Sequence, residues 1–148
     1  MSKISVLMSV YKKENPEYLR ASLESILVQT RTADEILLIE DGPLTQELYQ
    51  VVAEYQKKCD YLHVHAMEQN VQLGRALAKG VELCQYDLIA RMDTDDIAMP
   101  DRLEKEEAYM EAHPEVDVVG GAIREFNDEG TIDRVKNMPK TQEAILEY

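Results

Sequence analysis

The sequence predicts an α/β protein with a Rossmann-like, doubly wound and mostly parallel sheet. Short apolar runs alternate with helical patterns through the first 115 residues, helix-start signals stand between them, and polar clusters follow three of the runs. Strands that alternate with helices in this way are typical of a parallel sheet whose helices cross over its faces. The 148 residues suffice for a single domain with a real core.

The chain opens with a predicted strand and helix. Ile4 to Val10 (ISVLMSV) is apolar and partly β-branched, which favours a buried strand. Asn15 is placed to cap a helix that has Pro16 at its first position. An apolar stripe on that helix suits packing against a sheet, and it consists of Leu19, Leu23, Ile26 and Leu27.

The second strand-and-helix pair repeats this pattern. Ile36 to Ile39 is a predicted strand, stopped by Glu40-Asp41-Gly42-Pro43, and Thr45 is placed to cap the next helix. The stripe on this helix consists of Leu48, Val51, Val52 and Tyr55.

Tyr61 to Ala66 (YLHVHA) alternates apolar and polar residues, which predicts a half-covered strand near a sheet edge. His63 and His65 fall on one side of it. Two histidines at this spacing could bind a metal, but without a third ligand nearby surface or packing roles are favoured.

A helix follows this strand, with a stripe formed by Leu73, Leu77, Gly80, Val81 and Cys84. Tyr86 to Pro100 (YDLIARMDTDDIAMP) then begins as an apolar run, which predicts a buried strand, and turns abruptly polar at Asp93, Thr94, Asp95 and Asp96. A further helix after Pro100 is expected to end near His113, before Pro114.

Three carboxylates within four positions repel one another unless they are solvated, protonated or neutralised by a cation. Mg²⁺ and Mn²⁺ bind through one or two carboxylates while substrate phosphates complete the shell, and the spacing of Asp93 and Asp95 suits that task. The alternative is a solvated turn that caps the following helix. The Asp-x-Asp spacing alone favours that turn, because short motifs discriminate loosely.

The positions of the polar clusters shift the balance toward function. In doubly wound sheets, ligands bind beyond the carboxyl ends of the strands, where the strand order reverses. Three clusters fall there: Tyr11 to Glu14, Asp41, and Asp93 to Asp96. We therefore expect one ligand site formed by all three.

The sequence changes character after Val116. Ala122 to Phe126 and Thr131 to Val135 predict a hairpin across a four-residue loop, Asn127 to Gly130. A helix capped by Thr141 is expected in the tail, and the pattern ends in mid-helix at Tyr148. We expect a single domain in which residues 1–115 form the ligand-binding core, and residues 116–148 the hairpin and the start of a second, incomplete half.

Charge and composition exclude several classes of protein. The net charge of −13 argues against a nucleic-acid partner, and it means that a phosphate-bearing ligand would need a cation. No apolar run reaches the length of a membrane span, and no signal peptide is recognisable, so a cytoplasmic location is expected. Cys59 and Cys84 lack metal or redox spacing and are interpreted as ordinary residues.

Four stretches carry a resemblance to a known family: ISVLMSVY, LLIEDG, NVQLGRALAKG and LIARMDTDDIAMPDRL. Together they resemble the family-two inverting glycosyltransferases, which have the GT-A fold and use nucleotide-sugar donors. The resemblance spans about Ile4 to Phe126. It implies transfer of a sugar, from a UDP-sugar first of all, to a saccharide or lipid-linked acceptor in cell-surface polysaccharide biosynthesis. Such an acceptor would bring the protein to the inner face of the membrane.

The resemblance also implies roles for single residues. Val10, Tyr11 and Glu14 would lie against the base and ribose, and Asp41 would accept a hydrogen bond from the uracil ring. Asp93 would hold the ribose or the water shell of the Mg²⁺ or Mn²⁺ ion.

The remaining roles concern the ion and the phosphates. Asp95 would bind the ion directly, and Asp96 is expected to brace the loop. Arg75, one turn from the expected basic position, is either a phosphate contact or a solvent-facing arginine. Gln72 departs from the family pattern, since a glycine often stands there.

No catalytic base is nominated, because in this family it comes from residues that would follow Tyr148. The sequence therefore predicts a donor-binding part with little activity of its own, whose uncovered sheet surface favours self-association. Two other readings stay open at this point. One is another metal-dependent phosphoryl or nucleotidyl transfer enzyme, and the other is a non-catalytic acidic binding module.

Overall fold

A computed structural model describes residues 2–147 of the chain. It divides into two compact units, one that ends at Glu107 and one that begins at Ala108. The division falls inside helix α4 (Arg102–Ala112), a little before the boundary after residue 115 that the sequence suggested. Each unit is described by itself.

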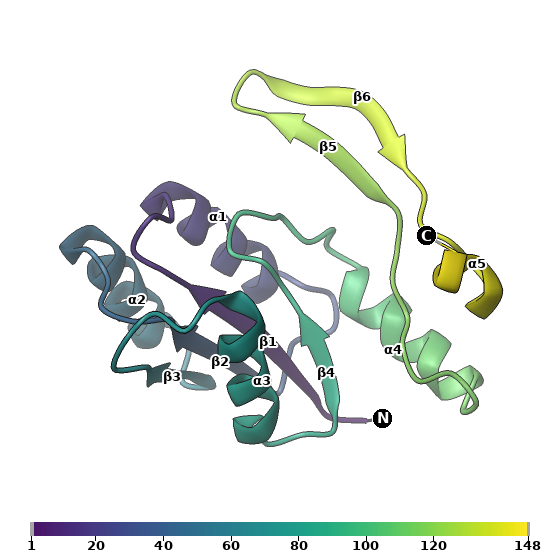
Figure 1. Cartoon of the computed structure of the whole chain (residues 1–148), viewed down its shortest axis with the longest axis horizontal. Helices are drawn as coiled ribbons and strands as arrows, with labels where there is room; N and C mark the ends of the chain where they lie inside the picture. The colour runs from purple at the N-terminus through teal and green to yellow at the C-terminus, as the bar shows by residue number, and fades with distance from the viewer. Residues whose placement is uncertain (1, 148) are drawn as a thin grey trace. The chain divides into compact units, whose positions relative to one another are not determined.

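The first unit contains the parallel sheet that the sequence predicts. Its strands are β1 (Ile4–Val10), β2 (Glu35–Glu40), β3 (Leu62–Ala66) and β4 (Leu88–Arg91). All neighbouring pairs are parallel, in the order β3-β2-β1-β4 (Figure 1). Strand order therefore reverses between β1 and β4, and this makes the carboxyl end of that pair the switch point of the sheet.

The first two helices begin where their capping residues predict. Before α1 (Pro16–Leu27), the Asn15 side chain accepts a hydrogen bond from the Glu17 N–H at 2.8 Å. Before α2 (Gln46–Lys58), the Thr45 Oγ1 accepts one from the Leu48 N–H at 3.3 Å. Each cap satisfies one N–H donor that the first helical turn leaves without a partner.

The core lies on both faces of the sheet. The apolar stripes of α1 and α2 pack on one face against alternate residues of β1 and β2, and the fully buried members include Val6, Met8, Leu23, Leu38 and Tyr55. On the other face, α3 (Leu73–Leu83) packs through Ala76 against Leu7, Leu37 and Ile39. Gly80 brings α3 close to the sheet, since a Cβ there would lie 2.3 Å from Leu7 Cδ1.

Two expectations about burial were wrong. β4 was expected to be buried, but Leu88, Ile89 and Ala90 are only half-buried. The reason is position: β4 is an edge strand, and within the described part of the first unit no strand pairs with its outer side. In α3, Leu73 and Val81 are exposed, because this helix approaches the sheet through small residues and its larger side chains stand beside the contact.

β3 is the opposite edge strand, as its alternating pattern predicts. On it, His63 is exposed and His65 is half-buried. Neither histidine belongs to a group of three or more metal-ligating side chains among residues 2–147.

The second unit contains the predicted hairpin. β5 (Ile123–Asn127) pairs antiparallel with β6 (Gly130–Lys136), and Asn127 lies opposite Gly130. The turn is therefore Asp128-Glu129, two residues and not the expected four. Gly130 is the first residue of β6 and has a φ of +133°, a value that glycine adopts readily. The tail forms α5 (Gln142–Glu147), and Thr141 caps it by accepting from the Ala144 N–H at 3.1 Å.

Among the described residues, no helix combines the length and the apolar character that crossing a bilayer requires.

Candidate functional site

A cavity of about 420 Å³ opens in the first unit where the sequence predicts a ligand site. It lies at the carboxyl end of the sheet, beside the switch point between β1 and β4. Its lining residues come from four segments at the carboxyl ends of the strands: Ser9, Tyr11, Glu14, Asp41, Asn70, Gln72, Leu73, Asp93, Thr94 and Asp95. The structure thus brings together all three polar clusters, which are far apart in the sequence.

Two residues expected at the site are not among those that line the cavity. Val10 is fully buried, and its side chain packs with Met8 in the core on the α1 and α2 face of the sheet. Arg75 is exposed in the first turns of α3 and does not line the cavity. The strand alternation of β1 explains Val10, because residues 6, 8 and 10 share one face.

The residues Asp93 to Asp96, called the acidic loop here, follow β4. Asp93 is paired with Arg91, whose Nη2 lies 3.0 Å from Oδ1 and whose Nε lies 3.2 Å from the same oxygen. Desolvation raises the pKa of the Asp96 carboxyl, and the negative charges of Asp95 and Asp93 raise it further, although the residue as a whole is exposed. This is the mutual repulsion that the sequence predicts for clustered carboxylates.

Thr94, between the two expected metal ligands, is buried and holds the acidic loop to β1. Its hydroxyl donates to Glu14 Oε2 at 2.5 Å and lies 3.4 Å from the Ser9 carbonyl oxygen. The other carboxylate oxygen of Glu14 accepts from the Asn15 N–H at 2.9 Å. Glu14 therefore joins the loop after β1 to the acidic loop, a contact that the sequence analysis missed.

Asp41 is buried and fixes the segment that leads from β3 to α3. Its Oδ1 accepts from the Val71 N–H at 2.7 Å, and its Oδ2 accepts from Asn70 Nδ2 at 3.1 Å. The next residue, Gly42, has φ +86°, and a Cβ there would lie 2.6 Å from the Asn70 nitrogen. The Asp-Gly pair is therefore required at this point both for its hydrogen bonds and for close backbone approach.

Burial also affects the residue before Asp41. Glu40 is buried at the end of β2, and desolvation raises the pKa of its carboxyl above the ordinary value. It is not among the cavity residues, so the acidity of the cavity comes from Asp41 and from the residues of the neighbouring loops.

Gln72 has a strained backbone at the edge of the cavity. Its φ of 72° and ψ of 157° place it in a region that only glycine occupies readily, and within residues 2–147 no other non-glycine residue has a positive φ. It stands directly before α3, and its N-cap position has no side-chain capping bond. Strained residues of this kind occur where the surrounding structure holds them, often at ligand sites.

The donor set suits a divalent cation that is only partly held by protein. Among the described residues that line the cavity, four are carboxylates and none is lysine or arginine. No three His, Cys, Asp or Glu side chains within residues 2–147 form a cluster that could hold a metal alone. Asp93 and Asp95 offer hard oxygen ligands, so phosphates and water would have to complete the shell, as is usual for Mg²⁺.

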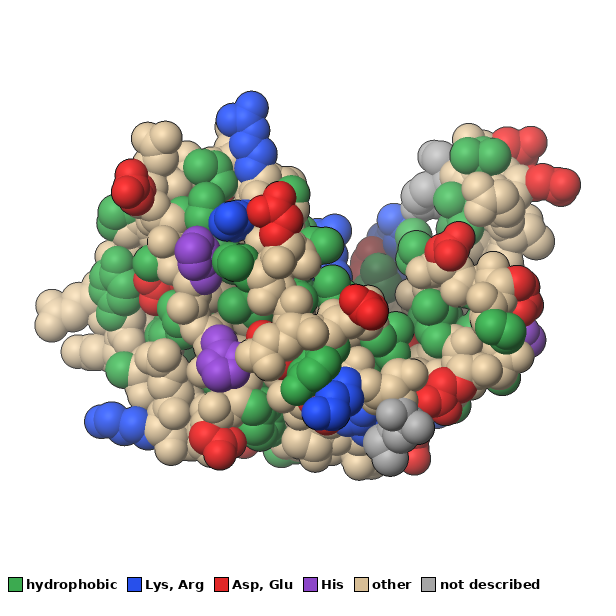
Figure 2. Space-filling view, turned by 90° about the horizontal axis from the view of Figure 1, so that it is seen from below, with side chains coloured by type: hydrophobic (Ala, Val, Ile, Leu, Met, Phe, Trp, Pro, Cys, Tyr) green, Lys and Arg blue, Asp and Glu red, His purple; other side chains and the backbone are tan. Residues whose placement is uncertain are grey.

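Basic side chains are dispersed on the surface as well. On the face seen in Figure 2, Lys and Arg side chains (blue) lie apart from one another and form no continuous patch. Inside the cavity, no described lining side chain is basic, so a phosphate-bearing ligand there would be accompanied by a counter-charge such as a divalent cation.

Comparison with solved structures shows that this chain has the GT-A fold of glycosyltransferases. The complex of S. aureus TarS residues 1–349 with UDP-GlcNAc has a TM-score of 0.67 at 23% identity, covering 76% of this chain and 32% of that one. The mannosyltransferase PcManGT from Pyrobaculum calidifontis, in complex with GDP-Man and Mn²⁺, has a TM-score of 0.66 at 15% identity, covering 82% and 34%. At these identities the likeness shows the fold.

Sequence comparison then gives the family. The chain belongs to glycosyl transferase family 2, whose family model matches residues 5–148. A glycosyltransferase of Haemophilus influenzae is 46% identical over 147 residues, which are 99% of this chain and 55% of that protein. The amylovoran biosynthesis glycosyltransferase AmsE of Erwinia amylovora is 44% identical over 97% of this chain and 53% of its own length.

A third relative carries a donor and an acceptor in its name. The UDP-Gal:alpha-D-GlcNAc-diphosphoundecaprenol beta-1,3-galactosyltransferase of Escherichia coli is 34% identical over 99% of this chain and 53% of its own length. The chain thus spans about half the length of the relatives it matches.

Proposed function

We propose that this chain forms the donor-binding part of a glycosyltransferase that takes its sugar from a nucleotide-diphosphate sugar. The observation that carries the proposal is the convergence of Tyr11, Glu14, Asp41, Asp93 and Asp95 on one switch-point cavity. This convergence occurs in a chain of glycosyl transferase family 2, which makes a chance arrangement of solvated turns a poor explanation.

Different cavity residues would contact different parts of a bound nucleotide. Tyr11 is exposed and would lie against the base and ribose, beside Glu14. Asp41 already accepts two hydrogen bonds, and each carboxylate oxygen retains a further lone pair for the ring N–H of a uracil. UDP is therefore the nucleotide we propose first.

Asp93 and Asp95 would hold Mg²⁺ or Mn²⁺, with Asp95 as the direct ligand. When bound, such an ion stabilises negative charge on the diphosphate that leaves during sugar transfer. Without a cation, Asp93 is paired with Arg91. When a cation binds, this ion pair must lengthen, or the Asp93 carboxylate must contact both Arg91 and the cation. Thr94 and Glu14 keep the acidic loop close to β1 and thus define one wall of the cavity.

The acceptor and the reaction geometry are proposed from the family. We propose an inverting transfer to a saccharide or lipid-linked acceptor in cell-surface polysaccharide biosynthesis, and the names of two relatives support it. The general base is expected beyond Tyr148. A lipid-linked acceptor would place the protein in the cytoplasm at the inner face of the membrane.

The test is a calorimetric titration of UDP into the 148-residue chain, with Mn²⁺ present and with the metal chelated. We expect binding that requires Mn²⁺ and that is lost in Asp95→Asn. Asp87→Asn is the matched control, because Asp87 is exposed and does not line the cavity, so this variant should bind as the unchanged chain does.

Other outcomes separate the parts of the proposal. Binding of GDP or dTDP in place of UDP would change the donor and leave the function standing. A folded chain that binds none of the three nucleotides in a metal-dependent way would contradict the proposal that this part holds the donor.

A further inference from the structure

Three polar residues are buried in α1 and just after its end. Ser22 and Ser25 lie in α1, and Gln29 follows its end, with exposed fractions of 0%, 7% and 5%. Ser22 and Ser25 share the buried face of α1 with its apolar stripe, and Gln29 is buried beyond the helix end. Buried polar groups are costly unless they are hydrogen-bonded. Their hydrogen-bond partners therefore indicate why polar residues stand there.

All three bond to the segment that carries the acidic loop. The Ser22 hydroxyl donates to the Asp93 carbonyl oxygen at 3.0 Å. The Ser25 hydroxyl oxygen accepts from the Ala98 N–H at 3.0 Å and donates to the Ser22 carbonyl oxygen at 2.7 Å.

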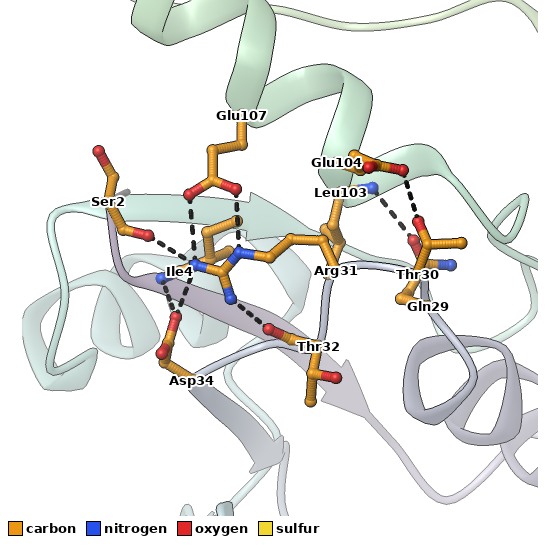
Figure 3. Close-up of polar contacts among 10 residues, drawn as sticks. All are labelled: Ser2, Ile4, Gln29, Thr30, Arg31, Thr32, Asp34, Leu103, Glu104 and Glu107. Atoms are coloured by element: carbon orange, nitrogen blue, oxygen red, sulfur yellow. Dashed lines mark hydrogen bonds and ion pairs between the residues drawn. The ribbon is translucent and has the colours of Figure 1, made fainter.

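Gln29 holds the end of the same segment. Its Nε2 donates to the Met99 carbonyl oxygen at 2.7 Å and to the Ser25 carbonyl oxygen at 3.0 Å. Its Oε1 accepts from the Leu103 N–H at 3.1 Å, a bond drawn in Figure 3 beside the contact of Thr30 with Glu104. One amide side chain thus bridges the loop and the first turn of α4.

The segment between β4 and α4 has no strand or helix to satisfy its backbone. Its buried residues Thr94 and Ala98 flank the exposed Asp95, Asp96 and Ile97. The bonds from α1 and from Gln29 fall on both sides of the exposed carboxylates, at residues 93, 98 and 99. Side chains of α1 and of Gln29 therefore take the place of a strand ladder in fixing this backbone.

We propose that Ser22, Ser25 and Gln29 are positioning residues that set the geometry of the acidic loop for a small divalent cation. The inference rests on the proposed function, because a fixed loop backbone matters here only if the carboxylates of Asp93 and Asp95 bind a cation. None of the three lines the cavity, so they act through the loop and not on the ligand.

The relative affinity for different cations distinguishes a positioning role from general destabilisation of the fold. Mg²⁺ requires near-ideal octahedral geometry, whereas Ca²⁺ accepts longer and more irregular coordination. A loosened acidic loop should therefore lose affinity for Mg²⁺ and Mn²⁺ more than for Ca²⁺. Partners that orient metal ligands typically contribute about 10-fold to 100-fold in metal affinity.

The experiment compares Ser25→Ala with Ser5→Ala in the 148-residue chain. Ser5 is also fully buried in a hydrogen-bonded position, but it bonds to Glu35 and to the Tyr86 N–H, at the start of β1. Mg²⁺, Mn²⁺ and Ca²⁺ are titrated in the presence of UDP, at equal folded fraction. We expect Ser25→Ala to lower Mg²⁺ and Mn²⁺ affinity roughly tenfold, with a much smaller change for Ca²⁺, and Ser5→Ala to leave all three unchanged.

Amide hydrogen exchange on the metal-free chain adds a measurement that needs no ligand. In Ser25→Ala, exchange at Ala98 and its neighbours should accelerate, while Ser5→Ala leaves this segment protected. An unchanged ratio of Mg²⁺ to Ca²⁺ affinity in Ser25→Ala, or an equal loss in Ser5→Ala, would overturn the inference. Failure of the unchanged chain to bind UDP with metal contradicts the proposed function instead, and unaltered exchange at Ala98 would then still overturn the positioning role.

Discussion

Gln72 stands where the backbone needs a glycine. Its φ of 72° and ψ of 157° are stabilised from outside, by the bonds that Asp41 makes to Asn70 and Val71, the two residues directly before it. A non-glycine residue in this region costs about 1–3 kcal/mol. The strain lies at the edge of the cavity, where the Gln72 side chain meets the ligand space.

Gln72→Gly should therefore stabilise the chain. Relief of the strain is opposed by the greater freedom of glycine in the unfolded chain, and we expect a net gain of roughly 1 kcal/mol in the free energy of unfolding. The measurement is urea unfolding followed by circular dichroism.

Gln69→Gly is the matched control, because the backbone at Gln69 has no positive φ and gains nothing from glycine. It should lower stability. Equal effects of the two substitutions would show that Gln72 is not strained.

At this scale the sequence located the carboxylates but not their partners. Asp41, Asp93 and Asp95 were predicted because each follows a strand, and the position of a strand end is readable from local pattern. Asn70 was not predicted as a lining residue, since its role depends on which loops meet in space. The sequence did carry a signal at α1, because Ser22 and Ser25 interrupt the apolar face of the helix and Gln29 follows its end.

Two glycines of α3 should respond in opposite ways to alanine. At Gly80 the new Cβ would lie 2.3 Å from Leu7 Cδ1, and Leu7 is buried, so its side chain has little room to move. At Gly74 nothing lies within 4 Å of the new atom.

We expect Gly80→Ala to lower the free energy of unfolding by about 1–2 kcal/mol, because overpacking outweighs the better helix propensity. Gly74→Ala should raise it by up to about 1 kcal/mol, because only the propensity changes. Thermal unfolding of the two variants checks this, and stabilisation by both would mean that α3 does not lie as close to β1 as described.

Arg31 joins α4 to the segments that precede β1 and β2, at the amino-terminal end of the sheet (Figure 3). Its guanidinium contacts Glu107 of α4 at 2.9 Å, Asp34 at 2.9 Å and the Ser2 carbonyl oxygen at 2.6 Å. Asp34 also accepts from the Ile4 N–H at 2.9 Å. Burial alone would raise the pKa of Asp34, but the bonds from Ile4 and Arg31 outweigh it, and the pKa lies below the ordinary 3.8.

This lowered pKa makes part of the stability dependent on pH. A carboxyl with a lower pKa in the folded chain contributes stability above its unfolded pKa, and the contribution disappears as pH falls through the folded pKa. Asp34→Asn should therefore cost about 1–2 kcal/mol at pH 7, and the difference from the unchanged chain should shrink below pH 3.8.

Urea unfolding at pH 7 and at pH 3 measures this difference. Asp87→Asn, an exposed substitution, should change stability little at either pH. A penalty for Asp34→Asn that is the same at both values would contradict the linkage.

The elements themselves were largely predictable. Caps at Asn15, Thr45 and Thr141 are local signals, and each marks the start of a helix in the structure. Burial was less predictable, because an apolar run such as that of β4 looks the same in the centre of a sheet and at its edge. The predicted hairpin loop was too long, because Asn127 and Gly130 pair as strand residues. A glycine can adopt the φ of +133° that this pairing uses, but its presence in the sequence does not show that it does so.

For the whole molecule, the alternation of strand and helix predicted the parallel sheet, and family membership agrees with it. The order of the strands was not readable from the pattern, although it determines where the site lies. Division into two units likewise depends on contacts that no single stretch encodes.

The acidic cavity has a consequence for how fast the proposed nucleotide-sugar donor would arrive. With a net charge of −13 and carboxylates around the opening, the protein repels an approaching nucleotide diphosphate before any contact is made. Added inert salt shortens the range of this repulsion, so the encounter rate of the free nucleotide should rise with ionic strength. A nucleotide already complexed with a divalent ion carries less negative charge and should show a weaker dependence. Stopped-flow mixing at several salt concentrations would thus reveal in which form the donor enters.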